Sequence, residues 1–228
     1  MERAVVLLSG GMDSSTLLHH VARRLRVPEV HALSFVYGQK HAREIEAARW
    51  QARAAGVTAH RVVELDFFAG LIGGGSALTA HGPDVPDLGA VPEAERDQPV
   101  TYVPHRNLIL LALAAAYAEA RQIADVFYGA QTQDRYGYWD CTRDFLERLN
   151  ATLALNRRRA VTVHAPFLTL RKGETLALGL ELGVDFSHTW SCYRGGPVPC
   201  RACPACVERA AAFAALRQAD PLLDTKGQ

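Results

Sequence analysis

Hydrophobic residues along this chain form short continuous runs that alternate with longer segments of helical periodicity. The runs predict strands at residues 4–8, 30–36, 61–65, 126–128 and 161–165, and the periodic segments predict helices at residues 14–25, 41–55, 107–122, 142–156 and 171–182. Strands and helices that alternate in this way form a parallel sheet with helices on both faces. The pattern therefore predicts the α/β class, with a doubly wound, Rossmann-like parallel sheet.

Two segments interrupt this alternation. Residues 70–99 are rich in glycine and proline and include the run Gly73-Gly74-Gly75. A stretch of this length without a periodic pattern is typical of a binding loop or a lid over a site. Residues 185–209 carry most of the cysteines. We therefore expect an ATP-binding α/β domain over residues 1–185 and a metal-binding segment over residues 186–228, packed on the same domain.

The sequence Ser9-Gly10-Gly11-Met12-Asp13-Ser14-Ser15 lies between the first predicted strand and the first predicted helix. Glycines allow the backbone to approach an anion, and a helix N-terminus presents free N–H groups and the positive end of its dipole. The chain contains no Gly-x4-Gly-Lys-Ser/Thr motif, so this is not a Walker-type loop. The motif resembles the PP-loop of ATP pyrophosphatases, which implies cleavage of ATP between the α and β phosphates.

Four of the five cysteines have the spacing C-x7-C-x2-C-x2-C, at Cys192, Cys200, Cys203 and Cys206. Four thiolates at such a spacing close a tetrahedral shell around Zn²⁺ and leave no position for water, which predicts a structural zinc knuckle. An iron–sulfur cluster, two disulfides, or redox-active thiols of a sulfur-transferring enzyme are the alternatives.

Composition and charge limit the classes of partner. The 228 residues are 49% hydrophobic and carry a formal net charge of +1, so no overall basic charge attracts nucleic acid or a membrane surface. No apolar run reaches the ~18 residues that span a bilayer, and the N-terminal residues lack the pattern of a secretion signal. We expect a cytoplasmic enzyme that binds neither nucleic acid nor membrane directly.

Further segments identify a family. They are residues 33–41 (LSFVYGQKH), 74–79 (GGSALT), 99–104 (PVTYVP), Arg106-Asn107, 180–185 (LELGVD) and 189–193 (TWSCY). Together with the loop and the four cysteines, they make residues 5–221 similar to QueC, the 7-cyano-7-deazaguanine synthase family. This resemblance implies that ATP adenylates the carboxylate of 7-carboxy-7-deazaguanine, that ammonia displaces AMP, and that a second ATP converts the amide to the nitrile. It also implies Mg²⁺, Zn²⁺ and a homodimer.

The resemblance assigns candidate residues to each part of the reaction. Asp13, Ser14, Arg106 and Lys172 are the candidate catalytic residues, because Arg106 can grip a carboxylate or phosphate and Lys172 can reach the leaving pyrophosphate. An acid in the first helical turn, such as Asp13, also has a purely structural role open to it through the helix dipole. The residues expected to hold ATP are Leu7, Leu8, Ser9, Gly10, Gly11, Met12, Asp13, Ser14, Ser15, Thr16 and Leu17.

The segment at residues 134–145 departs from the family pattern on the side where the second substrate is expected. Its candidate substrate-binding residues, together with Arg106 and Asn107, are Asp134, Tyr136, Trp139 and Asp140. New aromatic residues there leave one alternative to the nitrile synthase, a paralogue that transfers the activated acid to another amine or stops at the amide. A second alternative, a tRNA sulfurtransferase, rests on the PP-loop and the cysteines. In the cysteine cluster, Arg201 replaces the glycine that the family usually has after the second cysteine, a change that we expect to tilt one turn.

Overall fold

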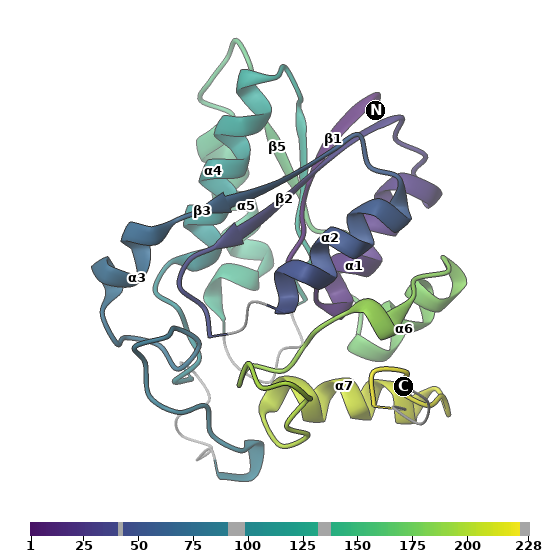
Figure 1. Ribbon diagram of the computed structural model, residues 1–228. Coiled ribbons are helices and arrows are strands. Elements are labelled where there is room, and N and C mark those ends of the chain that lie inside the picture. The colour runs from purple at the N-terminus through teal and green to yellow at the C-terminus, as the bar shows by residue number, and fades with distance from the viewer. Residues whose placement is uncertain (41–42, 91–98, 132–137, 224–228) are drawn as a thin grey trace.

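The computed structural model describes residues 1–40, 43–90, 99–131 and 138–223 (Figure 1). In this part of the chain five strands form one parallel sheet in the order β3-β2-β1-β4-β5. The strands are β1 (Arg3–Leu7), β2 (Glu29–Val36), β3 (Ala59–Glu64), β4 (Asp125–Phe127) and β5 (Thr162–His164). All five predicted strands are present, and the predicted α/β class is confirmed.

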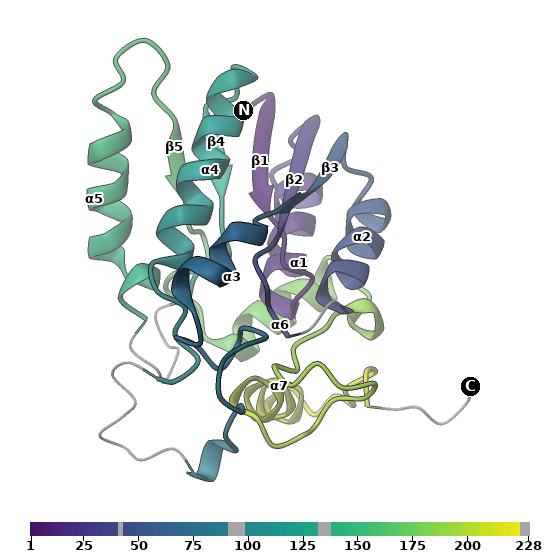
Figure 2. The same ribbon diagram turned by 60° about the vertical axis from the view of Figure 1, so that its left-hand side comes forward.

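The α-helices of the described chain cover both faces of the sheet. They are α1 (Met12–His19), α2 (Arg43–Ala55), α3 (Asp66–Ile72), α4 (Arg106–Ala120), α5 (Arg143–Leu153), α6 (Lys172–Glu181) and α7 (Pro204–Ala215). Helices α1 and α2 lie on one face and α4 and α5 on the other, while α6 and α7 lie beyond one end of the strands (Figures 1 and 2). The five predicted helices correspond to α1, α2, α4, α5 and α6.

The central strand β1 explains why the apolar runs are continuous. Val5 pairs with His31 of β2 on one side and with Val126 of β4 on the other. Ala4, Val5 and Val6 are completely buried, because Val5 faces the core under α4 and its two neighbours face the core under α1 and α2. A strand covered on both faces needs apolar residues at every position rather than at alternate ones.

The strand order creates a switch point between β1 and β4. From β1 the chain crosses to β2 and β3 on one side, and it later returns to β4 and β5 on the other side. The connections leave in opposite directions at the C-terminal ends of β1 and β4, which is where open parallel sheets bind ligands. The loop at residues 9–15 follows β1 directly, so it lies at this point.

Two helices were not predicted, and part of residues 70–99 differs from the lid that we expected. Helix α3 overlaps the start of that range, and α7 lies inside the C-terminal segment. Ser76, Ala77, Leu78 and Thr79 are buried, with exposed fractions of 3% or less. The N–H of Ala77 donates to the carbonyl of Val100 at 2.8 Å. These four residues are therefore an anchored wall of the interior and not part of a lid.

A buried ion pair holds separate parts of the C-terminal segment together. Arg209 of α7 and Asp220 are 3% and 8% exposed, and two guanidinium nitrogens donate to the carboxylate at 2.8 Å each. Arg209 also donates to the hydroxyl of Thr189 at 2.7 Å and to the carbonyl of Phe186 at 2.9 Å. None of the described helices has the length and apolar character needed to span a membrane.

Candidate functional site

A cavity of about 270 Å³ opens at the switch point of the sheet. It is bounded by the end of β1 and the turn after it, the residues that follow β2 and β4, the first turn of α4 and the C-terminal segment. Its lining includes Leu7, Leu8, Ser9, Gly11, Met12, Asp13, Ser14, Tyr37, Arg106, Asn107, Tyr128, Gln131, Cys141, Lys172, Trp190 and Ser191. The structure thus brings the predicted loop, Arg106, Asn107 and Lys172 to one cavity.

The turn after β1 is closed by the side chain of Ser14. The N–H of Ser9 donates to Ser14 Oγ at 3.1 Å, and the two serine hydroxyl oxygens lie 2.9 Å apart. Ser14 Oγ donates in turn to the carbonyl of Gly11 at 3.3 Å. These hydrogen bonds close the turn through its own residues.

Gly10 is required by the approach of a neighbouring helix. It adopts φ +84, and a Cβ atom at this position would lie 2.7 Å from the backbone nitrogen of Ala48 and still closer to the carbonyl oxygen of Glu44. Both atoms belong to the backbone of α2, so no side chain can move aside. A glycine is therefore needed for α2 to pack against this turn.

The predicted ATP residues divide into two groups. Leu7, Leu8, Ser9, Gly11, Met12, Asp13 and Ser14 line the cavity, whereas Gly10, Ser15, Thr16 and Leu17 are not among its described lining residues. Ser15, Thr16 and Leu17 are completely buried. Thr16 donates its hydroxyl to the carbonyl of Met12 at 2.9 Å, and Leu17 packs in the core under α1 and α2. The side chains of Ser15, Thr16 and Leu17 therefore support the turn from the interior.

Lys172 joins the turn to the C-terminal segment. Its Nζ lies 3.4 Å from Asp13 Oδ2 and 3.3 Å from Glu208 Oε2 on α7. Gln131, which follows β4, donates to Asp13 Oδ1 at 3.3 Å and to Thr175 Oγ1 at 2.7 Å. The predicted pair Asp13 and Lys172 is thus in contact, and Glu208 and Gln131 are additional members of the cluster.

Arg106 places a half-buried positive charge in the same cavity. Its Nη1 donates to Tyr37 Oη at 3.4 Å and its Nε to Asn107 Oδ1 at 3.3 Å. No carboxylate of the described residues lies within 4.0 Å of its guanidinium nitrogens. Burial by itself lowers the pKa of Arg106, but Tyr37 and Asp140 outweigh it and raise the pKa above its ordinary value. The guanidinium therefore stays charged and can accept an anionic partner.

The predicted substrate residues of the 134–145 segment are not gathered at the cavity in the described part of the chain. Asp134 and Tyr136 lie outside the described residues. Asp140 is 3% exposed, and its Oδ2 accepts the N–H of Asn107 at 3.2 Å, so it supports the first turn of α4 from beneath. Burial raises the pKa of Asp140, against the opposing effect of Arg106.

Trp139 is not among the described residues that line the cavity. Its side chain is 39% exposed, and its Nε1 donates to Tyr102 Oη at 2.9 Å. Its ring meets His105 and Phe145 edge-on. In this structure Trp139 therefore packs within the protein, and its role in substrate binding stays a prediction.

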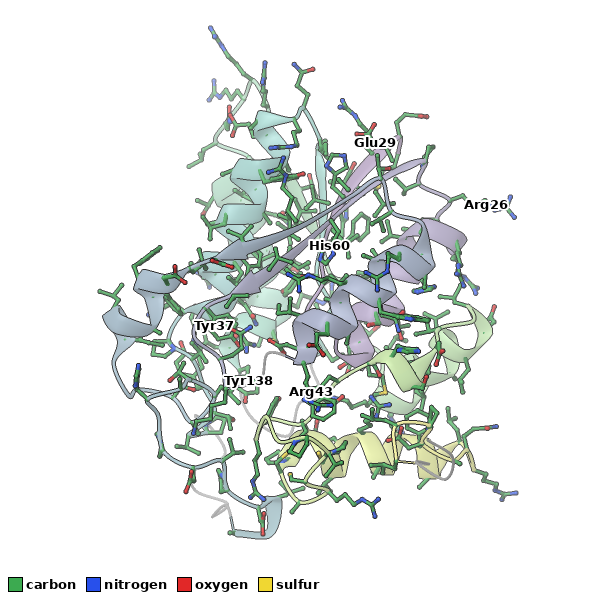
Figure 3. The ribbon with its side chains drawn as sticks, in the orientation of Figure 1. Arg26, Glu29, Tyr37, Arg43, His60 and Tyr138 are labelled. Atoms are coloured by element: carbon green, nitrogen blue, oxygen red, sulfur yellow. The ribbon has the colours of Figure 1, made fainter. Side chains whose placement is uncertain are left out.

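Trp190 forms the wall of the cavity on the C-terminal side. Its N–H donates to the carbonyl of Gly10 at 2.9 Å, and its indole Nε1 donates to the carbonyl of Cys192 at 3.1 Å. The guanidinium carbon of Arg43 lies 5.3 Å from the centre of its ring system. In Figure 3, Arg43 lies at the end of α2 that faces the C-terminal segment, and Tyr37 lies at the same end of the sheet.

The four cysteine sulfurs form a cluster that fits a metal. All four Sγ atoms lie within 4.8 Å of one another, and Cys192, Cys203 and Cys206 are buried. The N–H of Cys200 donates to Cys192 Sγ at 3.4 Å, and the N–H of Cys203 donates to Cys200 Sγ at 3.3 Å. Donation from the Cys203 and Cys206 thiols lowers the pKa of Cys192. Backbone donors of this kind orient and stabilise thiolate ligands.

Arg201 retains the turn that glycine usually makes at this position. It adopts φ +64, in the left-handed region that glycine occupies without strain. The chain therefore accepts the strain of a left-handed arginine at this turn, and the expected tilt stays a prediction.

Comparison with known proteins decides the family. The family model described as "Queuosine biosynthesis protein QueC" matches residues 3–217. The chain belongs to the QueC family. Relatives in this family include the 7-cyano-7-deazaguanine synthase of Trichormus variabilis, 41% identical over 230 residues that cover 99% of each chain. The enzyme of the same name from Marinobacter nauticus is 42% identical over 224 residues, which cover 97% of this chain and 96% of the relative.

A solved structure supports the fold. The U34-tRNA thiolase NcsA from Methanococcus maripaludis, solved with its 4Fe-4S cluster, aligns with a TM-score of 0.51 over 84% of this chain and 62% of that chain. The two sequences are 16% identical, so this likeness concerns the fold alone.

Four residues of the QueC-family site were missed from the sequence. Tyr37 follows β2 and Tyr128 and Gln131 follow β4, so their positions just after predicted strands were an available indication. Glu208 lies on α7, which was not predicted, and only the folded chain places it beside Lys172. Sequence spacing contains no information on that contact.

Proposed function

We propose that this chain converts 7-carboxy-7-deazaguanine, ammonia and ATP to 7-cyano-7-deazaguanine. The observation that carries this proposal is the single cavity in which the turn after β1 faces Arg106 and Lys172. The QueC family match and the names of its relatives supply the substrate class. They also favour this reaction over tRNA sulfur transfer.

A carboxylate is a poor electrophile, and its adenylate is a good one. In the proposed first step an oxygen of the substrate carboxylate attacks the α phosphorus of ATP, and pyrophosphate leaves. The N–H groups of the Ser9–Ser14 turn and the N-terminus of α1 would hold the phosphates. Lys172 lies beside the turn and would exchange its contact with Asp13 for the departing pyrophosphate.

Arg106 would hold the anionic acid in place for that attack. Its charge is desolvated by burial and has no carboxylate partner among the described residues, so a bidentate anion would satisfy it. Ammonia then attacks the acyl carbon, AMP leaves, and the amide is formed. A second adenylation on the amide oxygen and loss of AMP give the nitrile.

Two metals belong to this proposal. Asp13 carries the carboxylate of the Ser9–Ser15 turn and lines the cavity, so it is the residue that would contact Mg²⁺ on the polyphosphate. There the ion would offset the negative charge that develops on pyrophosphate. The four cysteines would hold Zn²⁺ in a closed shell. With Zn–S bonds of about 2.3 Å, a tetrahedral shell places the sulfurs ~4 Å apart, in agreement with the cluster here. A four-iron cluster would separate the sulfurs more widely, because the cluster itself lies between them.

The test is a reaction of the purified protein with 7-carboxy-7-deazaguanine, ATP, Mg²⁺ and ammonium, followed by mass spectrometry. We expect AMP, pyrophosphate and the nitrile, with two AMP for each nitrile. Amide that accumulates without nitrile, or an adduct with another supplied amine, would replace this proposal with the paralogue activity. Absence of AMP formation would refute adenylation altogether. Elemental analysis for zinc and light scattering for the expected homodimer complete the characterisation.

Arg106→Lys and Arg121→Lys form a matched pair for the role of Arg106. Arg121 lies at the other end of α4, where its guanidinium carbon is 3.7 Å from the ring centre of Tyr117. Lysine keeps the charge but cannot hold an anion through two parallel hydrogen bonds. We expect Arg106→Lys to raise the KM for the acid more than tenfold and Arg121→Lys to leave it unchanged.

A further inference from the structure

Tyr128 has a buried hydroxyl without a partner at the wall of the cavity. It follows β4, and its N–H donates to the carbonyl of His164 at 3.0 Å, which extends the ladder between β4 and β5. The residue is 5% exposed, and its Oη has no hydrogen-bond partner among the described residues. A buried hydroxyl left unpaired is destabilising, so its presence requires an explanation.

The other unpaired buried groups do not share this position. Ser15 Oγ and the Nδ1 atoms of His19 and His20 are also without partners among the described residues, but none of these three residues is in the lining of the cavity. Tyr128 is thus the one described side chain that combines an unpaired buried polar atom with a place at the cavity wall.

Neighbouring polar atoms on the same side are already bonded. Asn107 Nδ2 donates to Cys141 Sγ at 3.3 Å, and Asn107 Oδ1 accepts from Arg106. Burial, with added repulsion from Cys141 and Asp140, raises the pKa of Tyr128 above its ordinary value. Its hydroxyl is therefore protonated at neutral pH and can donate as well as accept.

The position of Tyr128 distinguishes between the two substrates. On the β2 side of the phosphate turn, the lining contains the apolar residues Leu33, Phe35 and Leu78. Tyr128 lies on the β4 side, and β1 separates the two. A deazaguanine ring has a lactam and an exocyclic amine along its edge, so it needs polar partners where it is buried.

We infer that the Tyr128 side chain, which lines the cavity, turns its buried hydroxyl toward the bound carboxylate substrate, hydrogen-bonds its heterocycle and so selects a guanine-like ring at the β4 side of the cavity. This inference rests on the proposed function, which supplies the identity of the substrate, 7-carboxy-7-deazaguanine. It adds a specificity-determining residue to Arg106, which acts on the carboxylate of the same molecule.

Tyr128→Phe tests this role with two measurements that move in opposite directions. The variant removes an unpaired hydroxyl, so we expect the ligand-free protein to melt at a temperature equal to or higher than that of the wild type. We expect the KM for 7-carboxy-7-deazaguanine to rise about tenfold, which is ~1.4 kcal/mol of binding. The KM for ATP should be unchanged. A purely structural role would lower the melting temperature and would not separate the two KM values.

Tyr117→Phe is the matched control. Tyr117 Oη is hydrogen-bonded to His31 Nδ1 at 2.9 Å, and Tyr117 is not among the described residues of the cavity lining. This variant should melt at a lower temperature and keep both KM values.

Three results would overturn the inference. They are an unchanged KM for the acid in Tyr128→Phe, a rise confined to the KM for ATP, and an equal rise in Tyr117→Phe. Calorimetric titration of wild type and Tyr128→Phe with 7-carboxy-7-deazaguanine separates this inference from the proposed function. If the wild type binds the acid without making nitrile, the proposed reaction fails, and the affinity ratio still decides the role of Tyr128. If the wild type does not bind the acid, the inference fails as well.

Discussion

Replacing His19 should remove much of the acid sensitivity of this protein. His19 ends α1 and is 1% exposed. Gln51 Nε2 donates to the carbonyls of Asp185 and His188, so Gln51 Oε1 accepts from His19 Nε2, 3.0 Å away. His19 Nδ1 is then an unprotonated, buried nitrogen without a described partner. A proton on that nitrogen would place an unpaired charge in the core.

The direction and size of the effect follow from the pKa of His19. Burial, with a contribution from Arg23, lowers the pKa from 6.5 to about 4, although the hydrogen bond to Gln51 opposes the change. The unfolded chain therefore takes up the proton first as the pH falls. Stability from this residue is fully present above pH 6.5, and it is lost between pH 6.5 and 4. At 1.36 kcal/mol per pKa unit the loss reaches about 3 kcal/mol.

The assay is urea unfolding of wild type and His19→Gln at several pH values between 7.5 and 4. Glutamine keeps a hydrogen-bond donor toward Gln51 and does not titrate. Any constant difference in stability between the two proteins shifts the whole curve and leaves the dependence of the unfolding free energy on pH unchanged. We expect the variant to lose about 3 kcal/mol less than the wild type across this range. His81→Gln, which removes an exposed histidine, should retain the wild-type slope. Parallel curves for wild type and His19→Gln would refute the reasoning.

Three further variants test the site and its supports. Gly10→Ala should lower the free energy of unfolding in urea by about 3 kcal/mol, because Gly10 has a positive φ and lies against the backbone of α2. Gly56→Ala, at φ +68 in open space, should lower it by only ~1 kcal/mol, and equal losses would contradict the contact argument. Arg201→Gly should raise the stability of the metal-loaded protein by about 0.5 kcal/mol in thermal unfolding, and a fall would show that no strain is stored there. Glu208→Gln removes one of the two carboxylates beside Lys172 Nζ and should change the KM for ATP two- to fivefold in steady-state assays, with unaltered metal content; an unchanged KM for ATP would remove Glu208 from the site.

Local patterns were sufficient for the elements and for the phosphate turn. Five strands and five helices could be predicted because a doubly covered strand needs a continuous apolar run and a surface helix needs a periodic one. Helix α7 was missed because the cysteines and prolines before it are typical of a loop. Pro204 is in fact at its first turn, where a missing N–H costs nothing.

Contacts between distant segments were beyond this kind of prediction. The sequence allowed Trp139 either to contact substrate or to pack within the protein, and only the fold shows that its indole N–H donates to Tyr102. Tyr128 was passed over because an aromatic residue at the end of a strand is ordinarily core. Only the folded structure shows that its hydroxyl is unpaired and that its side chain is at the cavity wall.

The cysteine-containing segment forms part of the cavity wall rather than an appendage. Trp190 donates its backbone N–H to the carbonyl of Gly10 and its indole N–H to the carbonyl of Cys192, so one residue connects the turn after β1 to a cysteine of the cluster. Glu208 begins the second turn of α7, just after Cys206, and reaches Lys172. We expect that loss of a metal from the cysteines would free both connections while the sheet and the cores on its two faces remain. Under the proposed function, metal binding would therefore contribute to ATP binding by placing the wall of the cavity, without any contact between the metal and the nucleotide.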